Sequence, residues 1–348
     1  QLNGVDCDYL PVSFQPAEAT RWPGLRGVSG QLVLDHLKLS IADGTSGVVG
    51  AGGVRLSEGV VELDDLAGKT TLTVKTRALG PATGMLGFVQ GSPLKTLIGD
   101  ALAQTTVGGD ADVGVALKLP LFDLNAFTVA GTVKFDGNDL KVHPAAPLLA
   151  RTRGTLAFTE QGFVVVGGNA RVFGGDLRFE GGLRPNPQGT ARLQFRGQGV
   201  ASAEGLRDGG LGAASSLLQN ASGSAAYTAQ LGFRGGVPEL QVVSNLQGMA
   251  MNLPAPLGKT AEAALPLRVD TAVLGVNGDV ATTDRVALQL GSALAPLVSL
   301  QYERDITASV PRVLRGSVAV GLDDGDAAPL PATGVVGNLR FDQLDLDA

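Results

Sequence analysis

The strongest constraint on this chain is an alternation of apolar and polar residues that recurs along much of its length. Apolar side chains occupy every second position over residues 113–121, and the same period returns over 127–135. Because successive side chains of a β-strand point to opposite faces, this period indicates strands with one apolar face. The chain is therefore predicted to be mainly β.

Shorter strands are predicted wherever the same alternation returns between turn signals. The chain contains 50 Gly and 18 Pro, many of them in clusters between apolar segments, which favours frequent reversals and an antiparallel sheet. Open sheets of more than about ten strands tend to curl or split. We therefore expect an elongated, twisted antiparallel sheet curled into an open apolar groove. The shorter strands are expected at 177–179, 193–195, 227–233, 240–242, 267–269, 286–290 and 316–320.

Two hairpins can be predicted from turn residues. Gly137-Asn138 offers the positive φ angles of a two-residue turn, which would place Phe135 opposite Leu140. The second predicted turn, over 159–162, would pair Leu156 and Phe158 with strand residues that follow it.

Two stretches break the alternation and predict short helices. One covers about 81–103, where Gly80-Pro81 and Ser92-Pro93 supply helix-start signals, and the other covers about 201–219. Residues 1–348 are thus interpreted as one continuous β-groove segment of a larger protein, interrupted by these helices. A fragment is expected because the sequence stops within an alternating pattern, and it shows neither a signal peptide nor an apolar stretch of about 18 residues.

Composition and motifs argue against several function classes. A net charge of -6 without a basic run does not favour nucleic-acid binding. One cysteine, Cys7, and two histidines, His36 and His143, are too few for the usual zinc sites, so no metal and no cofactor are predicted. No acid, base and nucleophile converge, so we predict no catalytic site and no enzyme.

Three short motifs have simpler structural interpretations. Gly258-Lys259-Thr260 resembles the end of a phosphate-binding loop but lacks its first glycine. Ser92 begins a Ser-x-x-Lys sequence without the partner motifs of penicillin-binding enzymes, and a helix-cap role is favoured. The aspartates of 323–326 lack the spacing of a calcium loop.

Several phrases resemble those of a known family. These are NDLKVHP at 138–144, GTLAFTEQG at 154–162, FGG at 173–175, NLPAPLGK at 252–259 and ALPLRV at 264–269. Together they are similar to the YhdP subfamily of the AsmA-like (AsmA/TamB/YhdP) bacterial envelope proteins. The resemblance implies an inner-membrane-anchored protein of the Gram-negative periplasm that conducts phospholipids toward the outer membrane. It implies contacts with both membranes through parts absent from this chain, leaves protein partners unknown, and supplies no catalytic residues.

The predicted function is lipid transport along the apolar face of the sheet, with phospholipid acyl chains as the bound partner. The alternative is a structural or adhesive β scaffold whose core is fully packed and binds no lipid; a sandwich of several domains would also produce the alternation. The predicted lipid-contacting residues are Leu32, Leu34, Val115, Leu117, Val133, Phe135, Leu140, Val142, Leu156, Phe158, Leu177, Phe179, Leu193, Phe195, Leu231 and Phe233.

Overall fold

The fold is described by a computed structural model. It describes residues 1–8, 23–48, 52–92, 104–123, 126–142, 146–185, 191–209, 218–234, 237–253, 257–278, 280–292, 296–308, 310–321 and 329–340. Within these ranges it contains twenty strands and two helices. The predicted mainly β, antiparallel fold with short helices is confirmed. The shorter predicted strands fall inside observed ones, and the stretches 113–121 and 127–135 each extend one residue beyond the observed strand.

The chain divides into two compact units, each described here by itself. Unit 1 comprises residues 1–171 and 183–191, and unit 2 comprises 172–182 and 192–348. One boundary of this division falls within β11 (Gly175–Pro185), whose residues belong partly to each unit.

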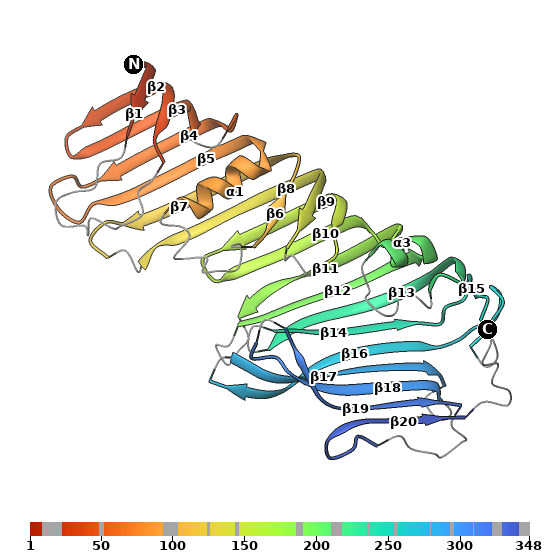
Figure 1. Cartoon of the computed structure of the whole chain (residues 1–348). Coiled ribbons are helices and arrows are strands. Elements are labelled where there is room, and N and C mark those ends of the chain that lie inside the picture. The colour runs from red at the N-terminus through yellow and green to blue at the C-terminus, as the bar shows by residue number, and fades with distance from the viewer. Residues whose placement is uncertain are drawn as a thin grey trace. The chain divides into compact units, whose positions relative to one another are not determined.

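Unit 1 is built on a meander in which each strand pairs with its neighbours in sequence order (Figure 1). All of these pairings are antiparallel, and short β6 pairs with β8. Its strands are β1 (Leu2–Cys7), β2 (Leu25–Asp35), β3 (Lys38–Val48), β4 (Arg55–Asp64), β5 (Thr71–Pro81), β6 (Thr106–Val107), β7 (Asp110–Pro120), β8 (Thr128–Lys141), β9 (Leu149–Thr159) and β10 (Gly162–Val172).

Unit 2 continues the same kind of meander, with β15 paired to β13 and β14 paired directly to β16. Its pairings are antiparallel except for β19 with β20, which run parallel. Its strands are β12 (Ala191–Ser202), β13 (Ala221–Arg234), β14 (Val237–Ser244), β15 (Met249–Met251), β16 (Leu267–Asn277), β17 (Val280–Gly291), β18 (Pro296–Asp305), β19 (Arg312–Val320) and β20 (Gly334–Leu339).

The predicted hairpin at Gly137-Asn138 is wrong, whereas the one at 159–162 is confirmed. Strand β8 runs through Gly137 as a β-bulge, so Phe135 and Leu140 lie along one strand instead of opposite each other. Asn138 is fully buried and its amide nitrogen donates to the carbonyl oxygens of Gly108 (2.8 Å) and Asp110 (2.9 Å). These two hydrogen bonds stabilise the bulge, because they give the buried side-chain amide of Asn138 the partners it needs. At the other turn, Phe158 pairs with Phe163 as expected.

Both helices begin inside the predicted helical stretches. Helix α1 (Ala82–Gln90) follows Pro81, which suits the start of a helix because it lacks a backbone N–H. It contacts β5 and β6 (Figure 1). Helix α3 (Ala203–Asp208) is capped by Ser202, whose hydroxyl oxygen accepts from the amide of Gly205 at 3.0 Å. Residues 93–103 and 210–217 of the predicted helical stretches lie outside the described residues.

The buried core of unit 2 is local and combines alanine with leucine and methionine side chains. It gathers at one end of the strands, where α3 and β13 meet the segment that leads into β15. Its buried members are Ala203, Ala221, Ala225, Leu246, Met249, Leu265 and Leu290. This cluster covers only part of the sheet, so the remaining apolar side chains have a different environment.

Candidate functional site: an apolar sheet face

The strand register of unit 1 places large aliphatic side chains in continuous rows on one face. Residues directly opposite each other in antiparallel strands share a face, so the register identifies the members of each row. One row crosses β2, β3, β4, β5 and β7, and a second crosses the same strands and reaches β8. The first row is Leu34, Leu39, Leu63, Leu72 and Leu119; the second is Leu32, Ile41, Val61, Val74, Leu117 and Val129.

Unit 2 has rows of the same kind on one of its faces. One row crosses six strands from β13 to β19, and a neighbouring row includes Phe195, Leu231 and Leu240. The six-strand row is Ala229, Val242, Val269, Leu288, Leu300 and Val318. In each unit, therefore, an apolar stripe runs across the strands rather than along them. We call this side the apolar face and the other side the polar face.

None of the sixteen predicted lipid-contacting residues is buried in the structure. Leu34 is 65% exposed, Leu32, Val142 and Phe233 are also exposed, and the others are half-buried. The register brings Val133 opposite Leu156 and Phe195 opposite Leu231. Leu140 lies opposite Leu149, beyond the bulge. Whether these side chains touch lipid stays a prediction.

The sequence analysis missed the face residues of β3, β4 and β5. Their alternation is visible in Leu39 and Ile41, and in Leu72 and Val74, but it extends over few residues. Strand β4 has a register shift next to Glu58, which has a positive φ of 54°. A bulge resets the alternation, and so the pattern in this strand is shorter than the strand itself.

Two aromatic rings on the apolar face lie over a glycine of the neighbouring strand. A Cβ atom built on Gly131 would come 2.4 Å from Cζ of Phe158, and one on Gly199 would come 2.9 Å from Cζ of Tyr227. The rings therefore occupy the space that a side chain on the neighbouring strand would fill. Burial also raises the pKa of the Tyr227 hydroxyl. The result is an apolar surface of low relief.

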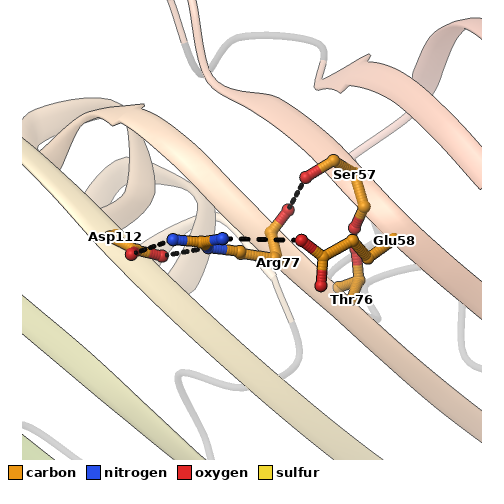
Figure 2. A network of polar contacts seen from close by, with 5 residues as sticks. All are labelled: Ser57, Glu58, Thr76, Arg77 and Asp112. Carbon is orange, nitrogen blue, oxygen red and sulfur yellow. Dashed lines mark hydrogen bonds and ion pairs between the residues drawn. The ribbon is translucent and has the colours of Figure 1, made fainter.

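The polar face of unit 1 carries ion pairs between neighbouring strands (Figure 2). Arg77 donates from Nε and Nη2 to the two carboxylate oxygens of Asp112, at 2.8 and 2.6 Å, and its Nη1 lies 3.4 Å from Glu58. The hydrogen bond from Arg77 lowers the pKa of the Asp112 carboxyl. The hydroxyl of Thr76 donates to the carbonyl oxygen of Ser57 beside this pair. These contacts hold β4, β5 and β7 in register across the bulge at Glu58.

The polar face of unit 2 carries a more buried charged group. Glu303, whose side chain is 8% exposed, accepts from Arg315 and from Arg285, each at 2.7 Å. These two guanidinium groups, Arg315 first, hold the pKa of Glu303 below its usual range. Charge on this face thus serves to join β17, β18 and β19.

Lys259, which the phosphate-loop resemblance singled out, has a structural role. Its Nζ donates to the carbonyl oxygens of Leu246 and Thr260, each at 2.9 Å, and also to that of Met249. The amine therefore holds together the segment that contributes Leu246 and Met249 to the core. Ser92 is buried, and its hydroxyl donates to the carbonyl oxygen of Val89 at 3.2 Å; the helix that it was predicted to cap lies outside the described residues.

In the described ranges, no three His, Cys, Asp or Glu side chains gather as a metal site would require. No helix in the same ranges has the length and apolarity needed to cross a membrane.

Comparisons with known proteins agree on one family. The family model described as YhdP protein matches residues 6–348. The intermembrane phospholipid transporter YhdP of Escherichia coli (strain K12) is 24% identical over 262 residues, which cover 74% of this chain and 20% of that protein. This chain thus spans about a fifth of the relative's length. No solved structure matches the chain. With the family model covering nearly all of the sequence, the chain belongs to the YhdP protein family.

Proposed function

We propose that this chain binds phospholipid acyl chains on its apolar face and conducts phospholipids between the inner and outer membranes of a Gram-negative envelope. It would do so in the periplasm, as one continuous segment of a longer protein that other parts anchor in the inner membrane. The name of the Escherichia coli relative, an intermembrane phospholipid transporter, supports this assignment.

The observation that carries the proposal is the incomplete burial of the aliphatic rows. In a packed scaffold, large aliphatic side chains on the inner face are mostly buried, because burying one stabilises the fold by about 1.5–3 kcal/mol. Here Leu32 and Leu34 are exposed, and Leu117 and Leu300 are half-buried. A contiguous apolar surface of this kind is typical of a binding surface.

The aliphatic side chains of these rows suit an acyl chain that slides along the apolar face. Leucine, valine and isoleucine offer dispersion contacts without directional bonds, so a chain that shifts by one methylene loses little. Acyl tails would lie against the apolar face while the head groups stay in water. Along such a row no position is a deep trap, and passive sliding suffices.

The test compares two substitutions on neighbouring positions of β8 that face opposite ways. Phe135 lies on the apolar face, and Thr132 is exposed on the polar face. Phe135→Asp should lower the phospholipid that co-purifies in mild detergent several-fold, because the new carboxylate would lie in the path of the acyl chains. Thr132→Asp, with the same charge change, should leave it unchanged. The measurement is lipid extraction with mass spectrometry, and circular dichroism checks the fold.

The packed scaffold predicts a different result. If the face is sealed in the whole protein, the wild-type chain carries no lipid, and Phe135→Asp unfolds it by burying an unpaired charge. Either finding would refute lipid conduction along this face. Leu117→Asp, on a neighbouring strand of the same face, repeats the test.

A further inference from the structure

One ion pair of unit 2 lies on the apolar face. In the register of β17 and β18, Leu288 pairs with Leu300, Val286 with Tyr302 and Asp284 with Arg304. These residues alternate, so all of them share one face. The pair formed by Arg285 and Glu303 occupies the adjacent positions and therefore lies on the polar face.

The guanidinium of Arg304 is held on two sides. Its Nε and Nη2 donate to the two oxygens of Asp284 at 2.9 and 2.5 Å, and its Cζ lies 5.7 Å from the centre of the Tyr302 ring. The Asp284 side chain is only 5% exposed, whereas that of Arg304 is 27% exposed. Among the described residues, no hydrogen bond is recorded from Nη1 of Arg304. One edge of a fixed planar cation is thus available on the apolar face.

Energetics make this placement unusual. Removing two charges from water costs several kcal/mol per ion, and replacing a buried ion pair by apolar residues of similar size is often neutral or stabilising. The residues opposite this pair on the flanking strands, Val273 and Val313, are apolar. An ion pair retained here is therefore better explained by a ligand than by stability, and a guanidinium with a free edge suits a phosphate oxygen.

An apolar hollow adjoins the Tyr302 side of this cation. Its volume is about 160 Å³, and its lining includes Leu300, Tyr302, Val313 and Val335. Pockets for whole small molecules have volumes of roughly 300–1,000 Å³, so this hollow can hold only a segment of a ligand. A cation next to an apolar hollow matches a molecule with an anionic group attached to hydrocarbon.

We propose that Arg304 binds the phosphate of a phospholipid whose acyl chain lies on the row that contains Leu300 and Leu288. This inference rests on the proposed function and adds to it a specific binding site for the phosphate of the head group. Asp284 acts as a positioning residue, because it orients the guanidinium without touching the lipid.

The test uses two soluble probes with the same short acyl chains, dihexanoyl phosphatidylglycerol and uncharged dihexanoylglycerol. Because Arg304→Met alone would leave Asp284 buried and unpaired, the informative variant is the double one, Asp284→Leu with Arg304→Met, which replaces the pair by apolar residues. The matched control is Arg285→Met on the polar face, where Glu303 keeps Arg315 as a partner. Circular dichroism verifies that each variant is folded.

The wild-type chain should bind the phosphatidylglycerol probe about tenfold more tightly than the uncharged probe, the difference expected for a charge-assisted hydrogen bond. The double variant should bind both probes equally, and Arg285→Met should keep the wild-type preference. Arg304→Lys should retain part of the preference, since it keeps the charge but loses the planar fork.

The outcomes separate this inference from the proposed function. If the wild-type chain binds both probes equally, or if the double variant keeps the preference, the proposal that Arg304 binds the phosphate is wrong while lipid binding stands. If the wild-type chain binds neither probe, the proposed function itself fails. If inorganic phosphate binds as tightly as phosphatidylglycerol, the site is one for a free anion and the lipid assignment is overturned.

Discussion

The apolar face of unit 2 is covered at one end of its strands and uncovered in their middle, before Val273 and Asp284 are buried again at the other end. At the covered end, Leu290 of β17 is 8% exposed and belongs to the buried cluster with Ala203 and Met249. Farther along, Val286 of β17 and Leu300 of β18 are half-buried. The two stretches lie on the same face, differ little in residue type and differ in what lies above them.

The difference teaches how a sheet can be stable without sealing its apolar face. Backbone hydrogen bonds between paired strands are satisfied within the sheet and need no cover, so a local core can hold the strands together. Small residues such as Ala221 and Ala225 let α3 approach closely at the covered end. The larger side chains of the uncovered stretch remain half-buried.

The largest expected effect comes from making the same truncation in both stretches. Leu290→Ala should lower the free energy of unfolding by about 2–5 kcal/mol, because it leaves a cavity in a closed cluster. Leu300→Ala should lower it by about 1 kcal/mol or less, because little surface is lost from a side chain that solvent already reaches. Urea unfolding followed by circular dichroism measures both, and equal losses would show that the uncovered stretch is packed after all.

The next largest effect is expected from Lys259, which holds together the segment that covers this end of the face. Lys259→Met removes the donor shared by the carbonyl oxygens of Leu246, Met249 and Thr260, and should cost about 1–3 kcal/mol because buried acceptors lose their partner. The exposed Lys118 of β7 provides the control, and Lys118→Met should change stability by less than about 0.5 kcal/mol. Equal urea midpoints for the two variants would contradict the structural role of Lys259.

The sequence predicted the secondary structure well where alternation was long and uninterrupted. Strand β7 and the hairpin between β9 and β10 follow directly from the spacing of Val115, Leu117, Phe158 and Phe163. The faces of these strands could also be predicted, since a period of two assigns every residue to a side.

The sequence could not predict where the pattern is broken by tertiary contacts. Gly137-Asn138 has the composition of a tight turn, but the amide of Asn138 donates to acceptors 28 and 30 residues away, at the first residue of β7 and just before that strand. Those partners turn the predicted hairpin into a bulge. Likewise, Leu290 and Leu300 have the same local pattern, and only the approach of α3 and Met249 decides which of them is buried.

A change of pH should distinguish the two stretches with a smaller effect. The covered cluster consists of apolar side chains, whereas the uncovered stretch around Tyr302 is backed on the polar face by Glu303. Because Arg315 and Arg285 lower the pKa of Glu303, its contribution to stability is present above the usual glutamate value of about 4.5 and is lost as pH falls through the lowered one. Acid should therefore loosen β17 and β18 before the cluster.

Hydrogen exchange measured between pH 6 and pH 3 can follow this order. After correction for the intrinsic rates, amides of β18 should lose protection earlier than amides near Ala221 and Ala225. In Glu303→Gln the difference should depend less on pH, because only Asp305 remains on β18 as a carboxyl with a lowered pKa. Simultaneous loss of protection in wild type would show that the two stretches unfold as one.

The smallest effect concerns an ion pair on the polar face of β11 and β12, outside both stretches. Arg196 of β12 contacts Glu180 of β11, but their side chains are 78% and 53% exposed. Water screens such a pair and ordering the two long side chains costs entropy, so Arg196→Ala should change the free energy of unfolding by less than about 0.5 kcal/mol. A urea midpoint close to that of wild type would show that this exposed ion pair does not stabilise the sheet measurably. A loss greater than about 1 kcal/mol would instead mean that exposed charges on the polar face stabilise the sheet in addition to the local core around Leu290.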